Sequence, residues 1–170
     1  MKATIQQRII AEIFEERLND ESTIGIVVFG SCAVGEEREN SDVDIEIISS
    51  KNKKWILSQK EKKHGIKIDF EIIPSRLYLE MVKEYPYLRY DYYKRHRIVL
   101  DRDGIVKRVI NNLERYYKKH PEVVEFCENK LKEMRKAKKM RRQPENAYRV
   151  YDEAEIKFSK KHRITRKFFR

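Results

Sequence analysis

Three aspartates stand at positions where their carboxylates could act together. Asp42 and Asp44 lie one residue apart in the alternating segment SDVDIEII, and Asp69 lies in a second alternating segment, IKIDFEII. In an extended strand, residues two apart lie on the same face, about 7 Å apart along the strand. If the two strands are neighbours in one sheet, the three carboxylates converge on one face of that sheet.

Such a cluster has the chemistry of a magnesium site. Mg²⁺ binds few protein carboxylates and fills its other positions with water and substrate phosphates. Two such ions about 4 Å apart would activate an attacking hydroxyl and stabilise a leaving pyrophosphate. The residues therefore predict a site for two Mg²⁺ ions, or Mn²⁺ in their place, on Asp42, Asp44 and Asp69. The alternative is that this pattern is only the solvated face of an amphipathic strand.

A glycine–serine pair, Gly30-Ser31, follows the apolar run TIGIVVF shortly before these aspartates. Glycine allows the backbone to approach a ligand closely, and residues 31–37 are predicted to begin a short helix whose free N–H groups bind anions. A triphosphate bound at this turn would meet metal ions held by Asp42 and Asp44. Cys32, inside the turn, is expected to be a packing residue, because no His or Asp lies near it in the sequence.

Hydrophobic periodicity predicts the elements that position these residues. The predicted order is helix 4–20, strand 23–30, strand 41–48, helix 54–65, strand 66–73, helices 75–85 and 86–96, edge strand 97–101, helix 104–120 and a last helix from 121. Thr4 and Asp103 are expected to cap the helices that follow them, and Gly65 to end the helix before it. This order predicts an α+β fold, with a small mixed β-sheet packed on helices and a C-terminal helical extension.

The net charge of +11 is unevenly distributed along the chain. Residues 1–100 contain 17 basic and 17 acidic side chains, whereas residues 101–170 contain 22 and 11. This split favours a balanced domain at 1–118 followed by a basic helical extension and tail at 119–170. The basic segment 128–142 is a solvated helix face, a surface for nucleic acid, since clustered lysine and arginine displace counterions from phosphates, or a docking surface for an acidic protein. Its short apolar stripe disfavours binding to an anionic membrane.

Several classes of protein are disfavoured by composition. No apolar run approaches the ~20 residues that span a bilayer, and the first residues lack the order of a signal peptide. We therefore expect a cytoplasmic protein with no membrane partner. Cys32 and Cys127 are far apart and form no Cys-X-X-Cys, so neither a zinc site nor a disulfide framework is indicated.

The same residues carry a resemblance to a known family. The chain resembles the DNA polymerase beta-like nucleotidyltransferase superfamily, of the minimal nucleotidyltransferase type. The signature is an apolar residue, Gly-Ser, about ten residues, then Asp-apolar-Asp-apolar, with a third carboxylate on a later strand. Phe29-Gly30-Ser31, Asp42-Val43-Asp44-Ile45 and Asp69 fill it, and the likeness covers residues 1–118.

The resemblance implies a nucleotidyltransferase fold and a specific reaction. A nucleoside monophosphate, AMP if the substrate is ATP, would move from a nucleoside triphosphate to a hydroxyl acceptor with release of pyrophosphate. Gly30 and Ser31 would hold the nucleotide phosphates. Asp42 and Asp44 would bind both metal ions, and Asp69 would share one ion and help to deprotonate the acceptor.

The chain departs from the family pattern at Val34, where many minimal members carry an arginine. Arg38, one helical turn further on, is a candidate to replace that charge near the phosphates. Two other functions stay open because of this departure and the basic C-terminus. One is an antitoxin-like protein that binds a helical HEPN toxin, and the other is an RNA-binding or RNA-end-modifying protein.

Two further groups of polar residues have less specific interpretations. Glu46 and Glu71 share faces with the aspartates and are expected to be solvent-facing strand residues. The alternative is that Glu71 replaces Asp69 as a metal ligand, which its extra methylene and its position disfavour. The five tyrosines of YPYLRYDYYKRHR (85–97) would either stack a base or pack on the sheet with their hydroxyls outward, and packing is favoured.

Overall fold

The structure, a computed structural model, describes residues 3–51, 56–84 and 89–139. Its helices are α1 (Ile5–Leu18), α2 (Ser31–Val34), α3 (Ser75–Glu84), α4 (Tyr90–Lys94), α5 (Ile105–Lys119) and α6 (Pro121–Lys139). Its strands are β1 (Thr23–Phe29), β2 (Val43–Ser49), β3 (Leu57–Lys63), β4 (Ile66–Pro74) and β5 (His96–Asp101). The predicted α+β class is confirmed.

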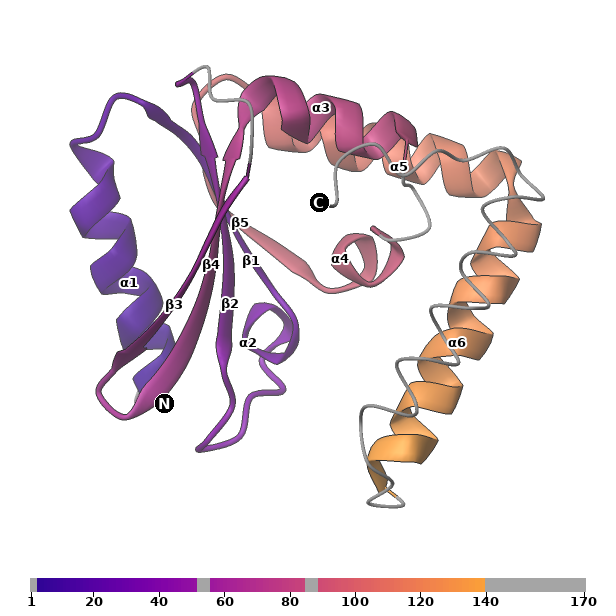
Figure 1. The fold of residues 1–170 in the computed structure, drawn as a ribbon, viewed down its shortest axis with the longest axis horizontal. Coiled ribbons are helices and arrows are strands. Elements are labelled where there is room, and N and C mark those ends of the chain that lie inside the picture. The colour runs from indigo at the N-terminus through magenta and orange to yellow at the C-terminus, as the bar shows by residue number, and fades with distance from the viewer. Residues whose placement is uncertain (1–2, 52–55, 85–88, 140–170) are drawn as a thin grey trace.

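The strands form one mixed sheet in the order β3-β4-β2-β1-β5. β2 and β4 run parallel, while each of the other neighbouring pairs is antiparallel. Helix α1 covers one face, and α3, α4 and α5 lie on the other side (Figure 1). At the end of α5 the chain turns sharply, and α6 runs beside the sheet, well separated from it. The two strands that carry the aspartates are therefore neighbours, as the site prediction required.

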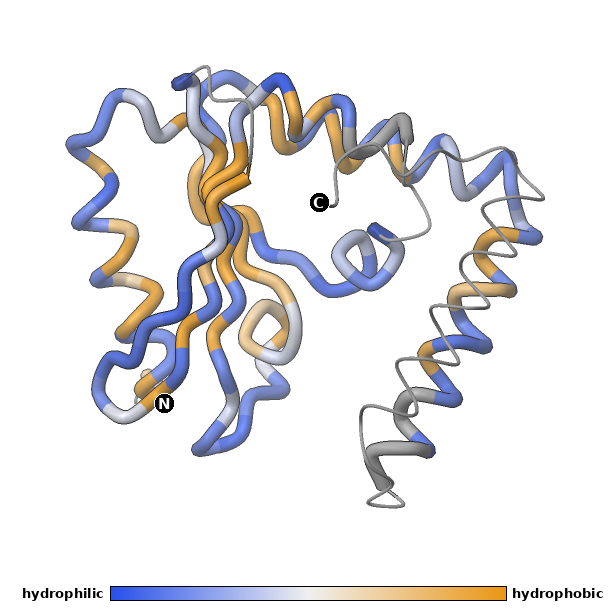
Figure 2. Tube along the Cα trace, in the orientation of Figure 1, coloured by the Kyte–Doolittle hydropathy of each residue, from blue (hydrophilic) through white to orange (hydrophobic). Residues whose placement is uncertain are grey.

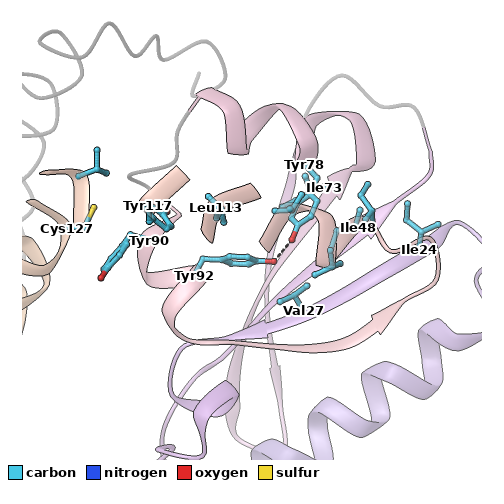
Figure 3. Packing of buried hydrophobic residues seen from close by; sticks show 14 residues of the cluster. Ile24, Val27, Ile48, Ile73, Tyr78, Tyr90, Tyr92, Leu113, Tyr117 and Cys127 are labelled. Atoms are coloured by element: carbon cyan, nitrogen blue, oxygen red, sulfur yellow. Dashed lines mark hydrogen bonds between the residues drawn. The ribbon is translucent and has the colours of Figure 1, made fainter. Parts of the chain in front are cut away.

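Alternation along the strands divides the core into two layers. One layer packs α1 on the sheet and contains Ile9, Ile13, Val43, Ile45 and Ile68. The other lies under α3, α4 and α5, and its residues include Val27, Ile48, Ile73, Tyr78, Tyr92 and Leu113 (Figure 3). The apolar residues gather in the central strands, whereas β3 is hydrophilic along most of its length (Figure 2). The polar residues of β2 and β4 therefore share a face with the second layer.

The predicted helix 54–65 is wrong over the part that the structure describes. Residues 57–63 form strand β3, which pairs with β4 in an antiparallel hairpin. The turn consists of His64 and Gly65, both with positive φ (50° and 84°), the backbone that two-residue hairpins favour. The segment LSQKEKK offers no apolar stripe for a helix to bury. The exposed edge of β4 instead supplies backbone hydrogen bonds to the segment.

Helix boundaries differ from the predictions in smaller ways. The Thr4 cap is confirmed, since its hydroxyl accepts a hydrogen bond from the Gln7 N–H at 3.2 Å. Asp103 does not cap α5. Asp101 caps this helix instead, because the chain turns back over the end of β5. The Asp101 carboxylate accepts hydrogen bonds from the N–H groups of Val106 (3.1 Å) and Lys107 (3.0 Å).

Helix α6 begins at Pro121, as predicted, and its first turns belong to the core. Val123 and Cys127 are buried there, with exposed fractions of 1% and 4%. The basic tail that the sequence predicts beyond Pro144 lies outside the described residues. Among the helices described, none is both long enough and apolar enough to cross a membrane.

Candidate active site

The carboxylate cluster is set by the parallel register of β2 and β4. Asp44 is the direct cross-strand partner of Asp69, and Glu46 is the partner of Glu71. Asp42 stands one residue before β2 begins, on the same face as Asp44. The alternating sequence and the register together place all three predicted aspartates on one face of the sheet, near one end of β2.

Lys67 lies among these carboxylates. Its Nζ is 3.2 Å from Asp69 Oδ2 and 3.5 Å from Asp42 Oδ2. The hydrogen bond with Asp69 and the nearby negative charge raise the pKa of Lys67, so its ammonium stays charged. The other oxygen, Asp69 Oδ1, is buried and has no hydrogen-bond partner among the described residues. In this part of the chain no three His, Cys, Asp or Glu side chains are grouped as metal ligands.

The turn after β1 needs glycine at position 30. Gly30 has φ 74° and ψ −149°, a backbone conformation that other residues rarely adopt. A Cβ at this position would lie 3.0 Å from Asp44 Oδ2, so the turn packs directly against a site carboxylate. Ser31 then begins α2, which is shorter than the predicted 31–37 helix because Gly35, with φ 72°, ends it after Val34. The structure thus brings Gly30 next to Asp44, and Ser31 follows it directly in the chain.

The first turn of α1 holds the loop that leads to Asp42. Gln6, 1% exposed, donates through Nε2 to the carbonyl oxygens of Arg38 (2.8 Å), Glu39 (3.0 Å) and Ser41 (3.3 Å). The Cys32 thiol donates to the carbonyl of Asp42 at 3.2 Å. These contacts fix the backbone between the glycine turn and β2.

Val34 lies in the short helix α2, as predicted, but Arg38 does not lie one helical turn further on. Because α2 ends at Val34, the helical turn that would bring Arg38 beside position 34 does not form. Arg38 is an exposed residue of the following loop, and its role at the phosphates stays a prediction. A different cation, Arg95, lies at the turn. Its backbone carbonyl accepts a hydrogen bond from the Gly30 N–H at 3.0 Å, and its guanidinium pairs with Glu36 at 2.9 Å.

The expectation that Glu46 faces solvent is wrong. Its side chain is buried at 1% exposure and forms an ion pair with Arg89, which is also buried. The Arg89 guanidinium also lies over the Tyr92 ring, 5.1 Å from its centroid. Burial alone would lower the pKa of Arg89, but the attraction of Glu46 outweighs it and raises that pKa. The pair attaches α4 to the sheet directly below the aspartates.

Glu71 is half-buried, so the expectation of a solvent-facing side chain is wrong here as well. Burial, and then the charge of Glu46, raise the pKa of its carboxyl. The helices packed on this face explain why both side chains are covered, since they lie over Glu46 and Glu71 and leave the ends of the strands open. Only the positions nearest the strand ends, Asp42 and Asp69 among them, keep substantial exposure, with 49% and 33% of their side chains accessible.

The tyrosines that the structure describes pack, as favoured, but the expected outward hydroxyl is wrong for Tyr92, whose hydroxyl is buried. Tyr90 and Tyr92 are buried, and the hydroxyl of Tyr92 shares a hydrogen bond with that of Tyr78 (Figure 3). Tyr85 and Tyr87 lie outside the described residues. Cys32 is a packing residue with 1% exposure, and burial raises the pKa of its thiol to about 11.

The roles of three residues of this site were not predicted from the sequence. Lys67 had a usable signal, because alternation puts it on the face of Asp69. Gln6 also had one, because it lies four residues before Ile10 on the buried stripe of α1. Arg89 had none: its partner Glu46 is 43 residues away, and only the packing of α4 brings them together.

Comparison with known proteins identifies the family. The model of the family "Polymerase beta, Nucleotidyltransferase" matches residues 9–104, more than half of the chain, and the chain belongs to this family. A solved nucleotidyltransferase-like protein from Exiguobacterium sibiricum 255-15 is similar in fold, with a TM-score of 0.50 and 11% identity over 63% of this chain. This chain covers 38% of that protein. No curated protein matches the chain.

Proposed function

We propose that the chain is a metal-dependent nucleotidyltransferase that moves AMP from ATP to a hydroxyl acceptor and releases pyrophosphate. The observation that carries this proposal is the register that sets Asp44 beside Asp69, on the face against which the Gly30 turn packs. Family membership supports nucleotidyl transfer in general. The nucleotide, the metal ions and the class of acceptor are part of the proposal.

The ligand types present fit divalent metal ions, although the described structure does not gather the three carboxylates into one ligand group. Asp42, Asp44 and Asp69 provide carboxylate oxygens, the ligand type that Mg²⁺ and Mn²⁺ prefer. Asp69 Oδ1 is buried without a hydrogen-bond partner in the described part of the chain, and a cation would satisfy it. When bound by these three residues, two ions would neutralise phosphate charge and favour ionisation of the acceptor hydroxyl.

The chain's own groups would position and deprotonate the substrates. The turn at Gly30 has no side chain to block the phosphates, and the Ser31 hydroxyl and N–H would hold them beside the aspartates. The acceptor oxygen forms a bond to the α-phosphorus while the bond from that phosphorus to pyrophosphate breaks. The proton of the acceptor hydroxyl passes to Asp69, which lies on the same face.

The test is transfer of label from α-phosphate-labelled ATP, with Mg²⁺ or Mn²⁺, to components of a cell extract. Wild type is compared with Asp69→Asn and with Asp103→Asn, a matched change in an exposed turn outside the site. Label on a protein or RNA band with wild type and Asp103→Asn, but not with Asp69→Asn, supports the proposal. Equal labelling by all three proteins, or none by folded wild type, contradicts it. A folded wild type without activity that binds a helical partner would favour the antitoxin-like alternative.

A second candidate, an RNA-binding or RNA-end-modifying role, is favoured by the segregated charge. Residues 101–170 carry 22 basic and 11 acidic side chains, and Lys107, Lys118 and Lys132 are exposed on α5 and α6. RNA neutralised by such a surface would bind more weakly as salt rises. Deletion of residues 145–170 should weaken tRNA binding and flatten its salt dependence, while ATP binding is unchanged. Unchanged tRNA affinity in the truncated protein would rule out this role for the tail.

A further inference from the structure

Lys67 is the one lysine of the β3–β4 hairpin that bridges the site carboxylates. Lys60 is the direct cross-strand partner of Asp69, and Lys62 is the partner of Lys67. Both are exposed, and neither forms an ion pair within the described part of the chain. Lys67 instead contacts two aspartates at once, at 3.2 and 3.5 Å. Positive charge and closeness to Asp69 alone therefore do not explain why Lys67 contacts both aspartates, since Lys60 has the same charge and also lies opposite Asp69.

The bridge has a simple electrostatic reason. Asp42, just before β2, and Asp69, in the neighbouring strand β4, are like charges, and their repulsion is relieved when a cation lies between them. The two aspartates are also two of the three proposed metal ligands. An ammonium and a divalent ion in this position would repel each other strongly, because both are positive and would lie within a few ångströms. The two cations therefore exclude each other.

We propose that Lys67 is a built-in competitor of the divalent ions: its ammonium neutralises Asp42 and Asp69 in the metal-free protein and must leave before metal binds. This inference rests on the proposed function, because it needs the metal site. Lys67 thereby lowers the affinity of the free protein for metal. It also stabilises the carboxylate cluster whenever the metal is absent.

The Lys67 side chain has room to move when a metal ion displaces it. The Lys67 side chain is 48% exposed and borders a solvent-open hollow of about 310 Å³ that Asp42 also lines. It can therefore leave the aspartates and extend into solvent without disturbing the core. The phosphates of a bound substrate would offer it a new anionic partner.

The experiment is a titration of the free protein with Mn²⁺ at low salt, with free Mn²⁺ followed by its electron paramagnetic resonance signal. The proteins are wild type, Lys67→Met, Lys67→Arg and, as matched control, Lys62→Met on the same face. Because two exposed ion pairs are removed, Lys67→Met should bind Mn²⁺ roughly 2- to 30-fold more tightly than wild type. Lys62→Met should change affinity by less, and Lys67→Arg should remain close to wild type.

The outcomes separate this inference from the proposed function. Equal Mn²⁺ affinity of Lys67→Met and Lys62→Met, or weaker binding by Lys67→Met, overturns the role of Lys67 while the metal site stands. Absence of Mn²⁺ binding by all four proteins, with circular dichroism showing them folded, overturns both the inference and the metal-dependent function. Tighter binding confined to Lys67→Met supports the competition.

Discussion

The buried ion pair between Arg89 and Glu46 gives the sharpest prediction about stability. Glu46 has 1% and Arg89 7% of its surface exposed. Arg89→Met would leave the Glu46 carboxylate buried without its partner, and removing one member of a buried pair costs about 3–5 kcal/mol. The lost contact with the Tyr92 ring adds to that cost. Because whole domains are stable by about 5–15 kcal/mol, the variant should lose a large part of its free energy of unfolding.

The assay is urea unfolding followed by circular dichroism, with Arg76→Met as matched control. Arg76 also pairs with a glutamate, Glu80, at 3.1 Å, but its side chain is 78% exposed, so this change should cost less than about 0.5 kcal/mol. The double variant Arg89→Met/Glu46→Gln should recover part of the loss, since no buried charge remains unpaired. Equal small costs for Arg89→Met and Arg76→Met would refute the reasoning.

Three further predictions concern a glycine, a glutamate and the two cysteines. Gly30→Ala should cost about 1–3 kcal/mol and weaken Mn²⁺ binding, because its Cβ would lie 3.0 Å from Asp44 Oδ2; unchanged Mn²⁺ titration would contradict the close packing. Glu71→Gln should flatten the dependence of stability on pH. Burial raises the folded-state pKa of Glu71 above 4.5. The contribution of Glu71 to the free energy of unfolding is therefore fully present below the unfolded pKa and is lost as pH rises through the folded pKa. Urea unfolding of wild type and variant across this pH range measures the difference, and parallel stability curves for the two proteins would disprove it. Burial raises the pKa values of Cys32 and Cys127 from 9.0 to about 11 and about 12. At pH 8 their thiolate fractions therefore fall about a hundredfold or more, and iodoacetamide should label them quickly only after unfolding; rapid labelling of native protein would refute this.

Most of the site could be predicted because its residues stand at short, regular spacings within single strands and turns. The alternation of β2 and β4 puts Asp42, Asp44 and Asp69 on polar faces, and the glycine turn stands directly after an apolar strand. Each of these features depends on residues a few positions apart. The parallel register of β2 and β4 then added the one fact that sequence could only assume, namely that the two polar faces are the same face.

The failures have a common cause in long-range packing. Residues 57–63 contain good helix formers, yet the free edge of β4 makes them a strand. Glu46 and Glu71 alternate like solvent-facing residues, but α4 brings Arg89 over the first and helices half-cover the second. Arg38 was placed by helical spacing, which Gly35 interrupts. In each case, a segment distant in the chain, or a single backbone angle, overrides the local pattern.

The class of fold, the three aspartates and the glycine turn could be predicted from the amino-acid sequence, because hydrophobic period and motif spacing are local properties of the chain. Tertiary structure decided the charge contacts that cross between elements. Strand pairing brings Asp42 to the Lys67 that already lies beside Asp69 on β4, and helix packing brings Arg89 to Glu46. Arg95 meets Glu36 from 59 residues away, because charge acts through space rather than along the sequence. The electrostatics of the site therefore became visible only when the chain was folded.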